Sequence, residues 1–325
     1  MRILVTGGAG FIGSHVVEAL VAEGHDVIVI DDLSTGKLEN LKGILDVDDA
    51  RRFWHSSIRN YSSCLVAAQG CDAIVHLAAL GSVPRSIEDP FATHEVNVTG
   101  TLNLLDIARH ARMKRFVYSS SSSVYGLQDG DSGFRRLSDA PNPISPYGAS
   151  KLSAERYCAA FWHSYGLPTI ALRYFNVYGP RQDPDTHYAA VIPRFFKAMH
   201  ARQAMTIYGD GEQSRDFTYV KDVVAANLLA LRTDVPMGRC FGQAYNVGCG
   251  MYTTVKQLAD AVGLEAAPLE QTLITHEKPR VGDVKHSCAD LEVSRCELGY
   301  EPKVGIAEGL RLTAPWYADK FWGKR

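Results

Sequence analysis

Two side chains suited to acid–base chemistry are four residues apart in the stretch Tyr147-Gly-Ala-Ser-Lys151. At the start of a helix, this spacing places a phenol and an ammonium group on the same face. Tyrosine has an unperturbed pKa of about 10 and is a poor base at neutral pH. A close ammonium group would stabilise the phenolate and let Tyr147 act as a general base. The same spacing also arises by chance on exposed helices. The neighbouring motifs must therefore show whether Tyr147 and Lys151 form a catalytic pair.

A run of five serines, residues 119–123, precedes this pair and follows the apolar segment Phe116-Val-Tyr118. Serine runs alone more often mark loops. Here the run ends a predicted buried strand, and open α/β sheets bind ligands at the carboxyl ends of their strands. The run is therefore better explained as the source of a hydroxyl that bonds the reacting oxygen of a substrate.

A glycine-rich turn with the spacing G-x-x-G-x-x-G connects the first predicted strand to the first predicted helix. Gly7 would allow the tight turn, Gly10 would let the backbone approach a pyrophosphate, and Gly13 would let the helix pack closely on the strand. The helix N-terminus would stabilise the anion. Eighteen residues after Gly13, the second strand ends in Asp31-Asp32, where an acid can bond the adenosine ribose hydroxyls and repel a 2′-phosphate. Together, the two features predict a site for NAD instead of NADP.

These groups require a sheet that brings its strand ends together. Residues 1–180 alternate short β-branched runs with helical patterns, which is typical of right-handed βαβ units. The predicted strands are Ile3–Thr6, Val27–Ile30, Ala73–Leu77, Phe116–Ser119 and Thr169–Tyr174, and the predicted helices are Ile12–Ala22, Ala92–Arg112 and Tyr147–Tyr165. Because the strands are unbroken apolar runs, helices should cover both faces of the sheet. The sequence predicts a Rossmann-type, doubly wound α/β fold with a parallel sheet over residues 1–180, as an NAD-binding domain.

After residue 180 the alternation of predicted strands and helices becomes less regular. Short predicted strands mix with predicted helices, at Thr206–Tyr208, Val220–Arg232, Tyr245–Val247 and Val255–Val262. This tail cannot extend the large sheet cleanly. We expect residues 181–325 to form a smaller α/β substrate-binding domain, partly interleaved with the first and with a soft boundary.

Composition excludes several classes of protein. The 325 residues are 46% hydrophobic and 22% charged, and a net charge of −2 gives no electrostatic steering toward nucleic acid or a membrane surface. No apolar stretch approaches the ~18 residues that a membrane span requires, and Met1-Arg-Ile-Leu-Val enters a strand directly instead of a signal peptide. The seven cysteines form no C-x-x-C pair, and the histidines show no H-x-x-x-H or H-E-x-x-H spacing. We expect a cytoplasmic protein with reduced, structural thiols and no metal site.

With these features in order, the sequence resembles the extended short-chain dehydrogenase/reductase family of nucleotide-sugar epimerases and dehydratases. The shared motifs are GGAGFIG at 7–13, HLAA at 76–79, NVTGTLNLL at 97–105, YGASK at 147–151, LRYFNVYGPRQ at 172–182, GDGEQSRDFTYVKD at 209–222 and PRVGDV at 279–284. Within the family, the sequence is most similar to the UDP-N-acetylglucosamine 4-epimerases of bacterial surface-polysaccharide pathways. That similarity rests on AALGSVPRSIEDP at 78–90, RQDPDTHYAAVIPRF at 181–195, GDVKHSCAD at 282–290 and PWY at 315–317.

The resemblance implies roles for individual residues. Ser121, Tyr147 and Lys151 correspond to the family's catalytic serine, tyrosine and lysine. The implied NAD contacts are Gly7, Gly10, Phe11, Ile12, Gly13, Asp31, Asp32, Thr35, Gly36, Ile58, Leu77, Ala78, Ala79, Asn97, Tyr147, Lys151 and Tyr174. The implied substrate contacts are Gly81 and Ser123 near the sugar, Ser121 and Tyr147, Asn176, Arg215 and Arg280 on the diphosphate, Asp283 on the uridine ribose, Thr206 and Tyr208 around the uracil, and Ala190, Val191 and Ser287.

One position departs from the family pattern. Where the family usually has Asp-Ile after the third strand, this chain has Ser57-Ile58. The aspartate that would bond the adenine amine is therefore missing, although Ile58 can still pack on the ring. We expect altered adenine contacts and retained binding.

The reaction implied by the resemblance is a reversible oxidation at C4 of a nucleotide-bound sugar. Tyr147, as the phenolate, would take the O4 proton directly or through Ser121 while a hydride passes to NAD. The 4-keto sugar would then present its other face, and the returning hydride would invert the centre. Dehydratases of the family carry Thr-Asp-Glu where this chain has Ser121-Ser122-Ser123, which argues against dehydration. Members that have lost catalysis and serve as NAD-binding scaffolds show a broken Tyr/Lys pair, whereas this pair is intact.

The expected sugar depends on one predicted wall position. Glucose-restricted epimerases resemble this chain but carry a tyrosine where it has Ser287. A small residue leaves room for an N-acetyl group at C2, and Gly81 keeps the neighbourhood open. We expect UDP-N-acetylglucosamine and UDP-N-acetylgalactosamine as substrates, with UDP-glucose or UDP-glucuronate as the alternatives.

The resemblance also implies a homodimer. The helical segments Ala92–Arg112 and Tyr147–Tyr165 would pair across a two-fold axis to form a four-helix bundle. Both carry apolar residues on more than one face. Packing within one chain explains the same pattern, so the sequence leaves both interpretations open.

Overall fold

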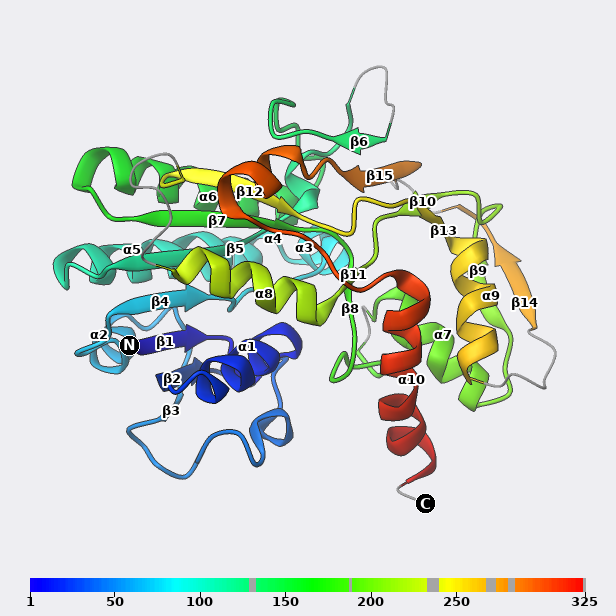
Figure 1. The fold of residues 1–325 in the computed structure, drawn as a ribbon, viewed down its shortest axis with the longest axis horizontal. Coiled ribbons are helices and arrows are strands. Elements are labelled where there is room, and N and C mark those ends of the chain that lie inside the picture. Colours follow the sequence, from blue (N-terminus) through cyan, green and yellow to red (C-terminus); the bar gives the residue numbers. More distant parts are fainter. Residues whose placement is uncertain (129–132, 187–188, 233–239, 267–272, 280–283, 324–325) are drawn as a thin grey trace.

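A large sheet dominates the computed structural model, which describes residues 1–128, 133–186, 189–232, 240–266, 273–279 and 284–323. Figure 1 shows this sheet with a second, smaller group of elements beside it. The sheet consists of β1 (Arg2–Thr6), β2 (Asp26–Asp31), β3 (Phe53–His55), β4 (Ala73–His76), β5 (Arg115–Ser121), β7 (Thr169–Tyr174) and β12 (Gln243–Val247).

All neighbouring strands of this sheet run parallel, in the order β12-β7-β5-β4-β1-β2-β3. The chain starts in the middle, moves to one edge and then crosses to the other side, which is the order of a Rossmann-type doubly wound fold. Along β1, Ile3 and Val5 belong to one apolar core, and Leu4 belongs to another on the opposite face. The predicted fold class is confirmed.

Helices cover both faces of the sheet. On one face, α1 (Phe11–Ala22) packs against α8 (Val220–Leu231), and on the other α5 (Gly100–His110) packs against α2 (Tyr61–Ala67) and α6 (Pro146–Tyr165). The Ser145 side chain accepts the Gly148 N–H at 3.1 Å and so caps the start of α6, with Pro146 in its first turn. Because α6 packs on β5, its first two turns lie beside the end of that strand.

The helix predicted over Ala92–Arg112 is interrupted. The short helices α3 (Val83–Glu88) and α4 (Pro90–His94) come first, and a π-helical turn at Glu95–Thr99 leads into α5. Such turns insert one residue into a helix and are frequent at functional sites. Here the turn contains Asn97, whose contacts are described with the site.

The smaller group of elements has its own core. α7 (Val191–His200), α9 (Val255–Ala266) and α10 (Ile306–Trp322) pack together beside the pair β9 (Met205–Tyr208) and β14 (Ile274–Glu277). Phe196 and Tyr317 stack in this core. A four-stranded sheet contains β13 (Thr253–Thr254), β10 (Ser214–Arg215), β15 (His286–Ala289) and β6 (Phe134–Arg135), and β8 (Val177–Tyr178) pairs with β11 (Thr218–Tyr219).

One expectation about the tail was wrong. β12 belongs to the tail, yet it extends the large sheet as an edge strand parallel to β7, with Tyr245 opposite Leu172. α8 also belongs to the tail and covers the sheet. The pairing of β12 joins residues distant in sequence, so a scan along the chain does not reveal it. The division of the chain into domains stays a prediction.

Candidate active site

The glycine-rich turn has a geometry that requires glycine. Gly7 has a φ of +69°, in the left-handed region. A Cβ atom at Gly13 would lie 2.0 Å from the carbonyl oxygen of Gly7, so α1 can approach the turn this closely only with glycine there. No described side chain caps the start of α1 at Gly10. The N–H groups of its first turn are therefore suited to bind an anion.

The two aspartates at the end of β2 differ in their surroundings. The Asp31 carboxylate is buried and accepts the N–H groups of Ala9 at 2.9 Å and Leu33 at 2.8 Å. Burial raises the pKa of Asp31, although both hydrogen bonds oppose the shift. Asp32 is half-buried and accepts the Ser34 N–H at 3.0 Å. Asp31 thus braces the glycine turn, a role that the sequence did not predict.

A cleft of about 360 Å³, here called the first cleft, extends from the glycine turn to Tyr147 and Lys151. Of the implied NAD contacts, its lining includes Gly7, Gly10, Phe11, Ile12, Gly13, Asp31, Asp32, Thr35, Ile58, Leu77, Ala78, Ala79, Tyr147, Lys151 and Tyr174. The structure therefore brings together residues from α1, β2, α6 and β7 and from the loops after β1, β2, β3 and β4. Ile58, at the position after the missing aspartate, is buried at its edge.

Gly36 and Asn97 are not part of this lining. A Cβ atom at Gly36 would lie 2.9 Å from the Asp31 carboxylate, so glycine lets this loop close on it. The buried Asn97 side chain accepts the Leu80 N–H at 2.8 Å and donates to the Leu80 carbonyl at 3.2 Å and the Ser150 hydroxyl at 3.0 Å. Asn97 thus joins a wall of the first cleft to α6 from behind.

The three implied catalytic residues meet where β5 ends and α6 begins. Lys151 is buried, and its Nζ atom donates to the Ser119 carbonyl at 2.7 Å. Burial lowers the pKa of Lys151 to about 7. Ser121 Oγ accepts the Ser123 N–H at 3.1 Å, which leaves the Ser121 hydroxyl proton free to be donated.

The electrostatics of Tyr147 differ from the expectation. Burial raises the pKa of Tyr147, and its hydrogen bond with Ser121 lowers it. Because burial lowers the pKa of Lys151 to about 7, only part of this lysine is an ammonium group at neutral pH, which weakens the predicted stabilisation of the phenolate. The chain by itself therefore holds Tyr147 as a neutral phenol at neutral pH.

A second cleft, of about 500 Å³, shares Gln182, Ala189 and Ala190 with the first, so the two clefts adjoin. Of the implied substrate contacts, it is lined by Asn176, Ala190, Val191, Thr206, Tyr208 and Arg215. These residues come from the loop after β7, the start of α7, β9 and β10. The second cleft is thus built mainly by the smaller group of elements.

Other implied substrate contacts lie outside the second cleft. Gly81 and Tyr147 line the first cleft. Ser121 and Ser123 line neither cleft, and the Ser123 carbonyl packs against Gly148 at the start of α6. These residues cluster at the catalytic end of the first cleft.

Ser287 lies one strand away from the lining of the second cleft. It stands opposite Arg215 in the parallel register of β15 and β10, and its carbonyl accepts the Asp216 N–H at 2.9 Å. Arg280 and Asp283 lie outside the described residues.

Arg194 is a functional candidate that the sequence analysis missed. It lies on α7 and lines the second cleft, with its guanidinium group 5.4 Å from the centre of the Tyr208 ring and its Nη2 atom 3.3 Å from Tyr208 Oη. Together with Arg215 it brings positive charge to this cleft. The only sequence signal was an arginine in the stretch 181–195, among residues that also fit an ordinary amphipathic helix.

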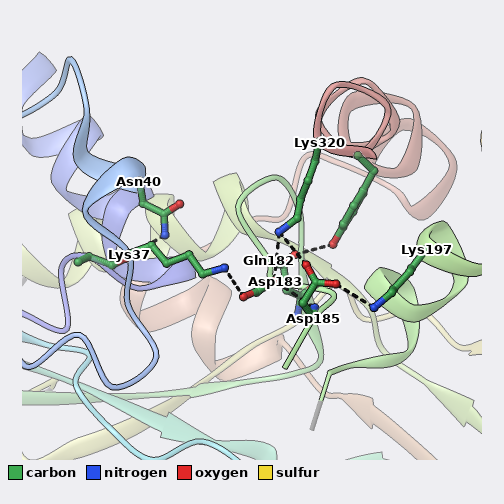
Figure 2. A network of polar contacts seen from close by, with 9 residues as sticks. Lys37, Asn40, Gln182, Asp183, Asp185, Lys197 and Lys320 are labelled. Carbon is green, nitrogen blue, oxygen red and sulfur yellow. Dashed lines mark hydrogen bonds and ion pairs between the residues drawn. The ribbon is translucent and has the colours of Figure 1, made fainter. Parts of the chain in front are cut away.

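Lysines from three elements hold the loop between the two clefts (Figure 2). Asp183, in this loop, pairs with Lys37 from the segment after β2 at 2.5 Å and with Lys320 of α10 at 3.2 Å. Lys320 also reaches Asp185 at 3.3 Å, and Lys197 of α7 pairs with Asp185 at 2.8 Å. Partial burial raises the pKa of Asp183, but its hydrogen bonds from the two lysines and the Asp185 N–H dominate and lower it to about 2. This lysine–aspartate network ties the glycine-turn side of the molecule to α7 and α10.

Two kinds of feature are missing from the part of the chain that the structure describes. None of its helices combines the length and the apolar character needed to cross a membrane. Its His, Cys, Asp and Glu side chains form no group of three or more that could hold a metal ion.

Comparison with known proteins decides the family. Residues 3–248 match the NAD dependent epimerase/dehydratase family. The chain belongs to this family. The predicted resemblance and the predicted cofactor, NAD, are thereby confirmed, and the chain is an NAD-dependent enzyme of the epimerase type.

Three relatives of this epimerase-family chain span three different sugars. A UDP-glucose 4-epimerase of Mycolicibacterium smegmatis is 39% identical over 98% of this chain and 99% of its own length. The structure of UDP-N-acetylglucosamine 4-epimerase from Methanobrevibacter ruminantium M1, in complex with UDP-N-acetylmuramic acid, has a TM-score of 0.89 and 36% identity and covers 98% of both chains. A mutant UDP-glucuronic acid 4-epimerase from Bacillus cereus, in complex with UDP-4-deoxy-4-fluoro-glucuronic acid and NAD, has a TM-score of 0.88 and 32% identity over 98% of this chain and 100% of its own. Overall likeness therefore does not select the sugar.

Proposed function

We propose that this enzyme inverts C4 of a UDP-hexose, and that its preferred pair of substrates is UDP-N-acetylglucosamine and UDP-N-acetylgalactosamine. The observation that carries the proposal is that the first cleft, which is lined by Tyr147 and Lys151, adjoins a second cleft of different character. One cleft has the groups that suit a dinucleotide. The other has two arginines for a diphosphate, Arg194 and Arg215, and an aromatic ring, Tyr208, for a base.

The first cleft fits NAD on structural grounds. Glycine at position 13 lets the start of α1 pack directly against the glycine turn, and this uncapped helix start offers N–H groups to the pyrophosphate. Asp32 lines the cleft at the end of β2, where it would hold the adenosine ribose. The redox chemistry at C4 is supplied by NAD when it is bound.

The residues of the chain handle the proton and the position of the sugar. To act as the base, Tyr147 has to be the phenolate, a form that the positive nicotinamide ring of bound NAD would favour. The phenolate would accept the proton from the sugar O4, directly or through the Ser121 hydroxyl, and return it once the other face of the sugar is presented. Burial raises the pKa of Tyr147, so the phenol is well suited to hold the proton between the two halves of the reaction. The diphosphate contacts with Arg194 and Arg215 keep the nucleotide in place while the sugar turns.

The preference for an acetamido sugar rests on small residues. Ser287 stands next to Arg215 in the sheet, so a larger side chain there would press toward the second cleft. A Cβ atom at Gly81 would meet no atom within 4 Å, which keeps this wall of the first cleft open. UDP-glucose and UDP-glucuronate remain the alternative substrates, in keeping with the named relatives.

A dehydratase is the second candidate, because the family includes such enzymes. Elimination of water would need a carboxyl group beside the catalytic serine. The residues that follow Ser121 are Ser122 and Ser123, which lie in a short 3₁₀ turn. This arrangement favours epimerisation.

The test is to incubate the purified enzyme, without added NAD, with UDP-N-acetylglucosamine and separately with UDP-glucose, and to follow C4 by proton NMR. We expect rapid formation of the galacto-configured acetamido sugar. Conversion of UDP-glucose alone would keep the chemistry and reject the sugar preference. If neither sugar changed, with or without NAD, the sugar preference would fail and UDP-glucuronate would be tested next. If C4 of that sugar also stayed unchanged, the 4-epimerase proposal would fail, and a 4-keto-6-deoxy product would be sought.

We also propose that the enzyme is a homodimer. On α4, which packs against α6, Phe91 is 83% exposed, and Ile87 on α3 is 65% exposed. Large apolar side chains of this kind gain stability when a second copy covers them. Sedimentation velocity at micromolar concentration should give twice the chain mass, and a monomer would contradict the proposal.

The proposed location is the cytoplasm. All seven cysteines are free thiols, and five of them are buried, as is common where thiols stay reduced. Activity in the soluble cytoplasmic fraction of the source cells, and none outside, is the expected result of cell fractionation.

A further inference from the structure

Glu155 is a buried carboxylate in α6 whose function is not explained by the reaction. It follows Tyr147 and Lys151 at the same four-residue spacing, so all three lie on one face of the helix. Its Oε2 atom accepts the hydroxyl proton of Ser120 at 2.8 Å. Both side chains are almost fully buried, with 5% and 3% of their surface exposed. A buried charge that reaches a serine of the catalytic strand has a structural cost that a surface glutamate avoids.

Arg173 of β7 is the partner that balances this charge. It forms two bonds with Glu155, Nη2 to Oε1 at 2.6 Å and Nε to Oε2 at 3.0 Å. Arg173 stands opposite Ser120 in the parallel register of β5 and β7. One carboxylate therefore holds two neighbouring strands of the sheet, and the geometry is bidentate, the arrangement in which an arginine–carboxylate pair is most directional.

The contacts continue from Arg173 toward the smaller group of elements. The Arg173 guanidinium group lies 4.7 Å from the centre of the Tyr125 ring, and the Tyr125 hydroxyl donates to Asn246 Oδ1 at 2.6 Å. The Asn246 amide donates to the carbonyls of Arg135 at 2.8 Å and Asp290 at 3.0 Å. Arg135 belongs to β6, in the same small sheet as Arg215 and Ser287. A continuous buried chain of contacts thus leads from the serine strand to the sheet beside the second cleft.

Ser120 lies between two residues that contact the catalytic side chains. The Ser119 carbonyl holds the Lys151 ammonium group or amine at 2.7 Å, and Ser121 hydrogen-bonds with Tyr147. Both contacts depend on the backbone at the end of β5, and Ser120 is the residue between them. Small displacements of catalytic groups lower reaction rates strongly, because the reacting atoms must be aligned.

We propose that Glu155 is a positioning residue, which acts on the reaction through the Ser120 hydroxyl. By holding that hydroxyl and Arg173 together, it fixes the strand end from which the two neighbouring serines engage the catalytic lysine and tyrosine. The proposal rests on the proposed 4-epimerase function and goes beyond it, since Glu155 itself touches neither cleft.

The decisive variant is Ser120→Ala, which removes the link to the strand and leaves the Glu155–Arg173 pair intact. We expect kcat per NAD-loaded site to fall about 10- to 100-fold, with KM for the UDP-sugar and the NAD content unchanged. The assay is C4 epimerisation followed by NMR, with bound NAD counted by its absorbance after denaturation. A residue that serves stability alone would lower the melting temperature and the number of NAD-loaded sites, but not kcat per loaded site.

The matched control is Ser153→Ala, on the same helix. Its hydroxyl is exposed and donates only to the Ala149 carbonyl at 2.9 Å among the described contacts, so kcat should stay at the wild-type value. Glu155→Gln is a supporting variant, with the same direction expected for kcat per loaded site. Glu155→Gln leaves the Arg173 charge buried without its counter-ion and can fail to fold. The test of the positioning role therefore rests on Ser120→Ala.

Failure of this inference is distinct from failure of the proposed function. If the wild-type enzyme epimerises and Ser120→Ala matches it in kcat per NAD-loaded site, the positioning role is overturned and the proposed function stands. If the wild-type enzyme converts no UDP-hexose, the proposed function fails and the positioning role falls with it.

Discussion

The two clefts differ in what forms their walls. The first has a wall of closely packed backbone, where the glycine turn meets the start of α1. The second is walled by side chains from α7, β9, β10 and the loop after β7. A backbone wall tolerates almost no added atom, as the 2.0 Å clearance for a Cβ at Gly13 shows. A side-chain wall can be rebuilt without disturbing the sheet, so the chain combines a fixed cofactor cleft with a second cleft whose specificity can vary.

The proposed base of the first cleft should show the largest effect, because the proton transfer at C4 depends on its hydroxyl group. Tyr147→Phe removes the proton acceptor and leaves the ring in place. We expect turnover to fall by about 10² to 10⁴ or more, with NAD content and UDP-sugar affinity, measured by calorimetry, largely intact. Unchanged turnover would reject Tyr147 as the base.

The backbone wall is tested by Gly13→Ala. The added methyl group would overlap the Gly7 carbonyl, so α1 must shift, at a cost of about 1–3 kcal/mol in the free energy of unfolding. We expect a lower melting temperature and loss of bound NAD. Gly305→Ala is the control, because residue 305 has a φ of −72° and a Cβ atom there meets nothing within 4 Å. Full NAD retention in Gly13→Ala would contradict the distinction between the two walls.

The side-chain wall is tested by Ser287→Tyr. The tyrosine ring should crowd Arg215 and the acetamido group of the substrate. It should therefore lower kcat/KM for UDP-N-acetylglucosamine relative to UDP-glucose by at least about tenfold. NAD content and melting temperature should change little, in contrast to Gly13→Ala. Ser287→Ala should keep the wild-type ratio. A ratio that does not move in Ser287→Tyr would remove Ser287 from the specificity site.

The smallest effect is expected at the lysine–aspartate network between the clefts. Asp183→Asn should lower the free energy of unfolding by at most about 1 kcal/mol, because partly exposed ion pairs contribute little, and the difference should shrink in high salt. The folded-state pKa of Asp183 is lowered to about 2, so its contribution is complete above the unfolded value near 4 and is lost as the pH falls through about 2. Thermal unfolding at two salt concentrations and at pH 7 and 3 measures this. A larger loss at high salt would contradict it.

The sequence predicts those features whose residues are close together along the chain. Gly7, Gly10 and Gly13 lie within one turn, so their spacing carries the geometry, and the alternation of strands and helices predicts the parallel sheet. The place of Arg194 in the second cleft and the pairing of β12 with β7 escaped prediction, because both come from tertiary contacts between segments far apart in the sequence. The pattern at Ala92–Arg112 predicts a helix but not the π turn that directs Asn97 behind the cleft.

The electrostatics of the catalytic pair could not be predicted from spacing either. Four residues on a helix place Tyr147 and Lys151 on one face, but the degree of burial decides their protonation. Burial lowers the pKa of Lys151 to about 7, and it raises the pKa of Tyr147. Only the folded surroundings give the sign of these shifts.

The lysine–aspartate network also constrains the order of events during synthesis. Lys37 lies in the segment after β2, whereas Lys320 comes from α10, and both must meet Asp183 before the loop between the clefts is held (Figure 2). A ribosome that adds about 5–20 residues per second needs roughly a quarter of a minute to a minute to pass from one lysine to the other. During that interval the glycine turn is already synthesised, whereas the loop that carries Asp183 still lacks its contact with α10.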